Sequence, residues 1–218
     1  MIKVIIIDCF GVIYRDAFKE FLTTNEVKLI KYLNQNSLGK ELGFPTYYYD
    51  LAHKIDMKKV SDEDFYTIFS EASGEDPEEI RKQMNAVDVM LKEEVIAFLK
   101  KIKSQYKLVL VANADRKFLQ KFLDHKPFLS QGRISELFDM PITSSDTGVL
   151  KTHALTFKKI ADTFQVKKED MLYIDDSAQH IKEVSSMEIN TIHFQNIEQL
   201  KSDFQTFERP NISPALSP

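Results

Sequence analysis

Cysteine is nearly absent from this sequence, whose 218 residues include only Cys9. A single cysteine excludes both a disulfide framework and a zinc site built from cysteines. Long hydrophobic runs are missing as well, because the N-terminal run from Ile2 to Ile7 carries Lys3 and ends at Asp8. A signal peptide needs a longer apolar region, and a membrane-spanning helix needs about 20 apolar residues. We therefore expect a cytoplasmic protein with no membrane partner.

A strong excess of charge is also missing. The formal net charge is -4 at pH 7, which provides no general attraction to nucleic acid, so we expect no nucleic-acid partner. The chain is 43% hydrophobic and 28% charged, which is ordinary globular composition and excludes disordered and fibrous classes. A chain of this length can bury a core without disulfides or metals. Nothing in the sequence indicates the oligomeric state.

Short β-branched runs bounded by polar residues indicate buried strands. These runs are Lys3–Ile7, Lys107–Val111, Met171–Ile174 and, more weakly, Thr191–Phe194. Helical periodicity lies between them, in Glu93–Lys103, Lys117–Leu123 and His153–Phe164. Strands that alternate with helices, and that are apolar on both faces, are typical of a covered parallel sheet. The sequence therefore predicts an α/β fold, a Rossmann-like parallel sheet core with helices on both faces.

Residues 15–84 interrupt this alternation and contain no convincing strand. Asp76–Pro77 places a cap residue before a proline at the first helical position, which indicates a helix over Glu78–Met84. We interpret residues 15–84 as an inserted α-helical cap domain, in which Tyr47–Tyr49 are candidates for a specificity pocket. The core then comprises residues 1–14 and 85–205. Residues 206–218 are expected to form a loose C-terminal tail, with little to bury.

Polar residues lie where the predicted strands end. Asp8 closes the first strand, Asn113 follows the second, and Asp175 and Asp176 close the third, while Lys151 follows Gly148. Ligands of open α/β sheets bind at the carboxyl ends of the strands. Several carboxylates at one edge suit a hard cation such as Mg²⁺. A cation beside a lysine in turn suits a phosphate or another oxyanion.

Each of these residues also has a purely structural interpretation. Asp175, Asp176 or Ser177 can cap the helix that follows, and an isolated lysine such as Lys151 is usually a solvated surface residue. Asp8 can be a turn residue. The joint placement of polar groups at three strand ends favours a functional site over these separate explanations.

Four motifs that contain these residues resemble the haloacid dehalogenase-like (HAD) hydrolase superfamily, in the group with a helical cap inserted after the first motif. The matching segments are Ile7–Val12, Val111–Asn113, Gly148–Lys151 and Tyr173–Ser177. The resemblance runs from Lys3 to about Phe204, and the order and spacing of all four motifs make it specific. It implies the same α/β core with a cap.

The resemblance implies covalent catalysis on a small, phosphorylated substrate. Asp8 would be the nucleophile, Lys151 would neutralise charge on Asp8 and on the transferring group, and Asn113 would orient the substrate oxyanion. The implied Mg²⁺ ligands are Asp8, the backbone carbonyl of Phe10, Asp175 and Asp176, the last as a ligand or just behind the ligands.

Two departures from the family pattern affect the proton-transfer groups. Phosphatases of this family place a second Asp two residues after the nucleophile as general acid and base, and Phe10 stands there. A positioned acid–base group contributes about 10² to 10⁴ in rate. Ala112 lacks the hydroxyl that the second motif normally supplies. We therefore expect weak or atypical phosphatase activity.

Three other functions stay open. A catalytically silent HAD-fold protein that binds a phosphorylated ligand or a partner would also explain Phe10. Dehalogenases of the family carry an aromatic residue at that position, although they work without a metal. Phosphonoacetaldehyde hydrolases carry a small residue there and need a Schiff-base lysine from the cap. The lysines available for that role are Lys54, Lys58 and Lys59.

A cysteine phosphatase is a further alternative, because Cys9 and Arg15 have the Cys-x5-Arg spacing after a strand. The residues between them are Phe-Gly-Val-Ile-Tyr, which are too bulky for a loop that wraps its backbone around phosphate. Cys9 is better explained as a small core residue beside the nucleophile.

Overall fold

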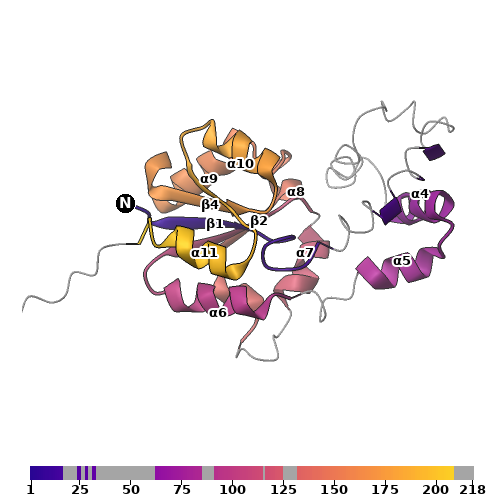
Figure 1. The fold of residues 1–218 in the computed structure, drawn as a ribbon. Coiled ribbons are helices and arrows are strands. Elements are labelled where there is room, and N and C mark those ends of the chain that lie inside the picture. Colours follow the sequence, from indigo (N-terminus) through magenta and orange to yellow (C-terminus); the bar gives the residue numbers. More distant parts are fainter. Residues whose placement is uncertain are drawn as a thin grey trace, which may run out of the picture.

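The computed structural model describes residues 1–16, 24–25, 28, 31–32, 62–84, 91–114, 116–124 and 132–208. A parallel sheet with strand order β3-β2-β1-β4-β5 lies at the centre of the described core (Figure 1). Its strands are β1 (Val4–Asp8), β2 (Lys107–Ala112), β3 (Met140–Thr143), β4 (Met171–Asp175) and β5 (Asn190–His193). Helices cover both faces, so the predicted α/β fold is confirmed.

Helices on the two faces bury alternate residues of the central strand. Ile5 and Ile7 of β1 belong to the core beneath α6 (Glu93–Ile102), α7 (Arg116–Leu123) and α11 (Ile197–Phe204). Val4 and Ile6 belong to the core beneath α9 (Ala154–Phe164) and α10 (Ala178–Ser185). Figure 1 shows α6 and α11 on one side of the sheet and α9 and α10 on the other. Successive strand residues point to opposite faces, which explains why Val4–Ile7 of β1 are all apolar.

The strand register aligns the ends of the three strands that carry polar residues. Asp8 pairs with Val111 of β2, and Ile7 pairs with Ile174 of β4. Asp175 therefore follows Ile174 at the same edge of the sheet as Asp8. The predicted convergence of these strand ends follows from the parallel pairing.

The edge strand β3 was not predicted from the sequence. It contains Pro141, which has no backbone N–H and for that reason is confined to edge strands and strand ends. β3 pairs on one side only, with β2. Three short helical segments accompany these strands: α8 (Ser144–Thr147) and the 3₁₀ turns Ile134–Leu137 and Lys168–Asp170.

Two helices of the predicted insertion are described, α4 (Asp62–Ser73) and α5 (Pro77–Met84), and they pack against each other. The carboxylate of Asp76 accepts the backbone N–H of Glu78 at 2.8 Å, so α5 begins with the predicted cap. The tyrosines Tyr47–Tyr49 and the lysines Lys54, Lys58 and Lys59 lie outside the described residues. The domain boundaries at 15, 85 and 206 stay predictions.

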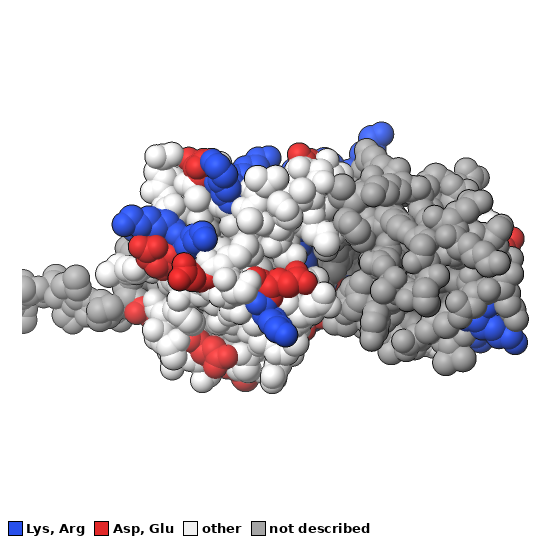
Figure 2. All heavy atoms as spheres, turned by 90° about the horizontal axis from the view of Figure 1, so that it is seen from above, with Lys and Arg blue, Asp and Glu red and all other residues white. Residues whose placement is uncertain are grey.

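Among the described residues, no helix combines the length and apolarity that crossing a bilayer requires. On the face of the core seen in Figure 2, acidic and basic side chains lie beside one another.

Candidate active site

Asp8 is buried at the carboxyl end of β1. Its Oδ1 accepts the backbone N–H of Cys9 at 2.8 Å. Its Oδ2 contacts the ammonium group of Lys151. Both carboxylate oxygens are thus oriented by the protein, which is the preorganisation that a nucleophile needs.

Lys151 joins Asp8 to a second carboxylate. Its Nζ lies 2.9 Å from Oδ2 of Asp175, and only 6% of its side chain is exposed. The backbone N–H of Lys151 donates to Oδ1 of Asn113 at 2.8 Å. Asn113 therefore holds the segment that presents Lys151, and its predicted contact with a substrate stays a prediction.

Asp175 is surrounded by hydrogen-bond donors besides Lys151. The backbone N–H of Ser177 donates to Oδ1 at 2.8 Å, and Nδ1 of His180 lies 3.1 Å from Oδ1 and 3.2 Å from Oδ2. The hydroxyl of Tyr173 donates to Oδ2. Sequence motifs alone assign no role to Tyr173 or His180. Their position in the chain, two residues before and five after Asp175, was the only available signal.

Asp176 completes a cluster of three carboxylates. Asp8, Asp175 and Asp176 each offer an oxygen within 4.8 Å of the others. The carboxylate of Asp176 lies against Gly11, where an added Cβ would come within 2.3 Å of Cγ of Asp176. Gly11 also has φ +91°, which side chains rarely adopt. A glycine is required here so that Asp176 can reach the cluster.

Three carboxylates and one lysine leave an excess of negative charge in a buried site. Burial and then the Asp175 charge raise the pKa of Asp8 well above its ordinary value, against the opposing effect of Lys151. Burial also acts to raise the pKa of Asp175, but Lys151 and His180 outweigh it and hold that pKa low. Burial lowers the pKa of Lys151, and the two carboxylates more than reverse the effect. Of Asp8 and Asp175, Asp8 is therefore the carboxylate whose charge is less compensated.

This donor set fits a divalent cation. Oxygen ligands are what Mg²⁺ prefers, and a cation at the cluster would remove the uncompensated charge of Asp8. The oxygens of Asp175 already accept several hydrogen bonds. Asp8, Asp175 and Asp176 are together the carboxylates that could hold it.

The opposite side of the site is aromatic. The ring of Phe10 lies 4.9 Å from the ring of Phe122 in a T-shaped arrangement and 5.8 Å from the ring of Phe118. The ring of Tyr14 also packs on Phe122, and its hydroxyl donates to the backbone carbonyl of Phe122 at 2.9 Å. Phe10 therefore packs against α7 and places no proton donor beside Asp8.

Cys9 is fully buried next to Asp8. Burial and then the Asp8 carboxylate raise the pKa of its thiol well above the ordinary value. A nucleophilic cysteine needs the opposite environment, one that stabilises the thiolate. This argues against the cysteine phosphatase alternative.

Comparison with known proteins identifies the family. The family model for haloacid dehalogenase-like hydrolases matches residues 2–183. No curated protein matches the chain.

Several solved structures share the fold. HAD family enzyme BT-2542 from Bacteroides thetaiotaomicron has a TM-score of 0.64 and 17% identity, covering 95% of this chain and 99% of that chain. The wild-type form of that enzyme has also been crystallised in complex with magnesium and inorganic phosphate, and matches with a TM-score of 0.61 and 17% identity over 89% of this chain and 95% of that chain.

Two further structures extend the comparison. A predicted HAD-like family hydrolase from Porphyromonas gingivalis has a TM-score of 0.63 and 19% identity, covering 96% of this chain and 100% of that chain. L-2-haloacid dehalogenase from Xanthobacter autotrophicus, with chloropropionic acid covalently bound, has a TM-score of 0.56 and 12% identity, covering 100% of this chain and 85% of that chain.

Proposed function

Because this chain belongs to the haloacid dehalogenase-like hydrolases, we propose that it hydrolyses a small phosphorylated metabolite through Asp8, with Mg²⁺ as cofactor. The observation that carries the proposal is the buried contact of Lys151 with both Asp8 and Asp175, beside a third carboxylate. Because Lys151 is buried between two carboxylates, it is not a solvated surface lysine. Its positive charge suits a site where an oxyanion is transferred.

In the proposed reaction a carboxylate oxygen of Asp8 attacks the phosphorus atom. The bond between phosphorus and the leaving oxygen breaks, the leaving oxygen keeps the electron pair, and an aspartyl phosphate forms. Water then attacks the phosphorus and gives up a proton to solvent, and the Asp8 carboxylate leaves with the electron pair of its bond to phosphorus. Lys151 lies against the oxygen of Asp8 and so stabilises negative charge in both steps.

Proton transfer is where this protein departs from an efficient phosphatase. The leaving oxygen needs a proton, and the ring of Phe10 has none to give. The proton must then come from solvent or from a residue other than Phe10. We therefore propose weak or atypical activity against phosphate monoesters, with a deficit of about 10² to 10⁴ for a lost acid–base group.

The proposed metal ligands are Asp8, the backbone carbonyl of Phe10, Asp175 and Asp176, the last as a ligand or just behind the ligands. Mg²⁺, when bound, supplies positive charge that favours ionised Asp8 and the phosphoryl oxygens. Gly11 serves this site because the absence of a Cβ makes room for the Asp176 carboxylate.

The decisive test compares the wild-type protein with Asp8→Asn on p-nitrophenyl phosphate and a panel of small phosphate esters, with and without Mg²⁺. We expect Mg²⁺-dependent turnover that Asp8→Asn removes. Calorimetric titration with Mg²⁺ provides a second measurement that does not depend on activity. Hydrolysis that is unchanged in Asp8→Asn would refute the aspartyl mechanism.

A catalytically silent binding protein is the second candidate, and the packing of Phe10 on α7 favours it. It predicts Mg²⁺-dependent binding of phosphate without turnover above the level of Asp8→Asn. A dehalogenase-like reaction is tested in the same series by release of chloride from 2-chloropropionate. A phosphonatase-like reaction is tested by trapping a Schiff base with borohydride.

A further inference from the structure

The carboxylate of Asp175 lies within a chain of contacts that ends at Asp8. Its Oδ2 accepts the hydroxyl of Tyr173 and lies 2.9 Å from Nζ of Lys151. The same Nζ contacts Oδ2 of Asp8. All four residues are buried. The position of the Asp175 carboxylate therefore influences where the ammonium group of Lys151 lies relative to Asp8.

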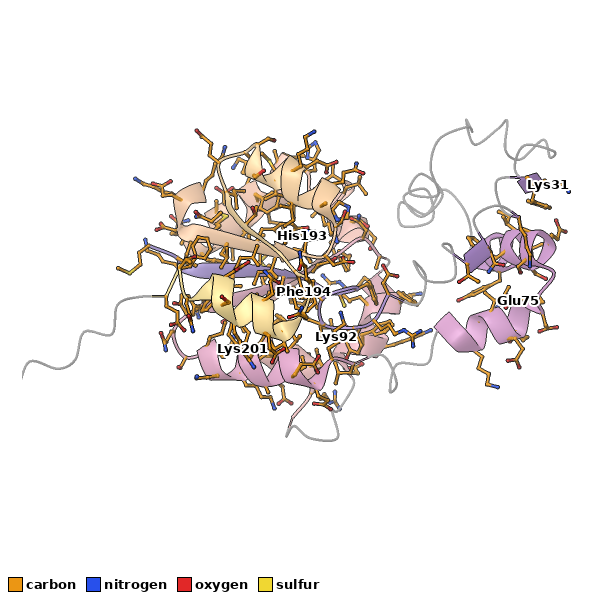
Figure 3. The ribbon with its side chains drawn as sticks, viewed as in Figure 1. Lys31, Glu75, Lys92, His193, Phe194 and Lys201 are labelled. Atoms are coloured by element: carbon orange, nitrogen blue, oxygen red, sulfur yellow. The ribbon has the colours of Figure 1, made fainter. Side chains whose placement is uncertain are left out.

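The backbone around Asp175 is fixed by β5. The carbonyl of Asp175 accepts the backbone N–H of Phe194 at 2.9 Å, and the carbonyl of Asp176 accepts Nε2–H of His193 at 3.0 Å. His193 and Phe194, labelled in Figure 3, lie at the end of β5. The freedom that remains to the carboxylate is therefore in its side-chain torsions. The last torsion of an aspartate has broad preferences, so hydrogen bonds must decide the orientation of the carboxylate.

Tyr173 holds one oxygen of this carboxylate. It lies two residues before Asp175 in β4, and alternate residues of a strand point to the same face. Its ring packs on the ring of Phe157 in α9, in a T-shaped arrangement with the centres 5.7 Å apart. Burial and then the charge of Asp175 raise the pKa of the Tyr173 hydroxyl well above its ordinary value. The hydroxyl thus stays protonated and donates to Oδ2.

His180 and Ser177 hold the carboxylate from the start of α10. Nδ1 of His180 lies 3.1 Å from Oδ1 and 3.2 Å from Oδ2, and the backbone N–H of Ser177 donates to Oδ1 at 2.8 Å. Burial acts to raise the pKa of Asp175, but Lys151 and His180 outweigh it and keep the carboxylate ionised. An ionised carboxylate can only accept hydrogen bonds, so Nδ1 of His180 carries the hydrogen.

We propose that Tyr173 and His180 are positioning residues for the reaction at Asp8. They hold the Asp175 carboxylate in one orientation, in which it places Lys151 against the nucleophile and presents an oxygen to the carboxylate cluster. Both act through Asp175 rather than on the substrate. This inference rests on the proposed function, which makes Asp8 the nucleophile and Mg²⁺ the cofactor. Loss of a hydrogen-bond partner of a metal ligand typically weakens metal binding by about 10 to 100-fold.

The first test is Tyr173→Phe, which keeps the ring and removes only the hydroxyl. We expect Mg²⁺ to bind at least about 10-fold more weakly in a calorimetric titration, because Asp175 loses a donor that orients it. On p-nitrophenyl phosphate with saturating Mg²⁺, kcat should fall while KM stays unchanged, since no substrate contact is lost.

Tyr106→Phe is the matched control for Tyr173→Phe. It removes the same atom from another buried tyrosine, which comes just before β2 at the amino ends of the strands. Mg²⁺ affinity should be the same in Tyr106→Phe as in wild type.

Two substitutions of His180 test the second contact. The amide nitrogen of asparagine is as many bonds from the backbone as Nδ1 of histidine, so His180→Asn can keep the donor that His180→Leu removes. We expect Mg²⁺ affinity to fall about 10-fold in His180→Leu and to be largely retained in His180→Asn. A merely structural role in α10 predicts the opposite order, because leucine is the better helix former.

A double-mutant cycle tests the link to Lys151 without metal. Urea unfolding is measured for Tyr173→Phe, Lys151→Met and the double variant, all without Mg²⁺. Because both side chains contact the same oxygen of Asp175, the two substitutions should have non-additive effects on the free energy of unfolding. The cycle of Tyr106→Phe with Lys151→Met should be additive, since these residues lie at opposite ends of the sheet.

Equal Mg²⁺ affinities of Tyr173→Phe and Tyr106→Phe would overturn the positioning role, as would an additive cycle of Tyr173→Phe with Lys151→Met. A failure of the proposed function looks different. In that case no phosphate ester is turned over in an Asp8-dependent way, while the cycle stays non-additive and supports the placement of Lys151 through Tyr173 and Asp175.

Discussion

The two sides of the candidate site differ in the type of side chain that forms them, charged on one side and aromatic on the other. On one side, Asp8, Lys151 and Asp175 form buried ionic contacts, and Asp176 lies close to them. On the other side, two residues after Asp8, the ring of Phe10 packs on Phe122. The buried charges on the first side each require a partner of opposite charge or a hydrogen-bond donor. The aromatic ring on the second side contributes to the apolar core.

This difference separates charge stabilisation from proton transfer. The charged side retains what an aspartyl nucleophile needs, an oriented carboxylate next to a buried cation. On the aromatic side, Phe10 provides no group that can move a proton. A site of this kind is suited to holding a phosphoryl group, and to transferring it only when the leaving group needs little help from an acid.

The largest effect is expected for Lys151→Met, which removes the cation from the charged side. Asp8 and Asp175 would then face each other, buried and without the cation that lies between them, so the free energy of unfolding should fall by about 3–5 kcal/mol without Mg²⁺. Turnover should fall by about 10² to 10³-fold. Chemical denaturation with and without Mg²⁺ measures the first effect, and added Mg²⁺ should restore part of the loss.

Lys159→Met, on the exposed face of α9, is the control for Lys151→Met. It should change the free energy of unfolding by no more than about 0.5 kcal/mol. Similar losses in the two variants would mean that the contacts of Lys151 contribute no more than an ordinary surface charge.

The next largest effect is expected for Gly11→Ala, which tests how Asp176 reaches the cluster. The added Cβ would lie 2.3–2.6 Å from the carboxylate atoms of Asp176. The carboxylate must therefore move, and Mg²⁺ should bind about 10 to 100-fold more weakly by calorimetry. Gly148→Ala is the matched control, because Gly148 also has a positive φ, +70°, but open space where the Cβ would be.

Both glycine variants should lose roughly 1–2 kcal/mol from backbone strain. Only Gly11→Ala should also lose metal affinity. Unchanged Mg²⁺ affinity in Gly11→Ala would contradict a role of Asp176 in metal binding.

Substitutions of Phe10 test the aromatic side. Phe10→Leu should lower the free energy of unfolding by about 1–2 kcal/mol, because it removes the ring contacts with Phe118 and Phe122. Phe10→Asp should cost more, about 2–4 kcal/mol, because it places a carboxyl group against those rings. It should nevertheless increase turnover of ethyl phosphate relative to Phe10→Leu, since a carboxyl group can supply the proton that phenylalanine cannot.

Thermal unfolding of Phe10→Leu and Phe10→Asp measures the two losses of stability, and steady-state kinetics measures the difference in turnover. If Phe10→Asp has no more activity than Phe10→Leu, then the lack of an acid at this position does not limit the reaction.

The smallest effect concerns Asp139, which comes just before β3, at the amino ends of the strands rather than at the carboxyl ends where the site lies. It shows how much a partly exposed ion pair contributes to stability. Partial burial acts to raise the pKa of Asp139, but contacts with Lys103, the backbone N–H of Leu108 and Lys107 outweigh it and hold the pKa below its ordinary value. Its stabilising effect is therefore present above the unfolded pKa of about 4 and is lost as the pH falls through the lower folded pKa.

Asp139→Asn should thus be less stable than wild type at pH 7 by roughly 1 kcal/mol or less. The difference should shrink toward zero under acidic conditions. Urea denaturation at a series of pH values measures it, and a difference that grew as the pH fell would contradict the assigned direction.

Structural features that depend on residues close together in the sequence could be predicted from the sequence. The runs Lys3–Ile7, Lys107–Val111 and Met171–Ile174 have the length and composition of buried strands, and each forms one. The convergence of Asp8, Lys151 and Asp175 also followed, because the ends of parallel strands meet at one edge. The edge strand Met140–Thr143 was not predicted because it contains Pro141, and a proline argues against a strand unless the strand lies at a sheet edge.

The sequence by itself therefore determined the fold class and the set of charged residues that meet at the sheet edge, because strand and helix periodicity act over short distances along the chain. Only the tertiary structure decided that Phe10 turns toward α7, that Tyr173 and His180 bind Asp175, and that Gly11 makes room for Asp176. These contacts depend on side-chain direction and on packing between segments distant in the sequence, and no local pattern records either of them.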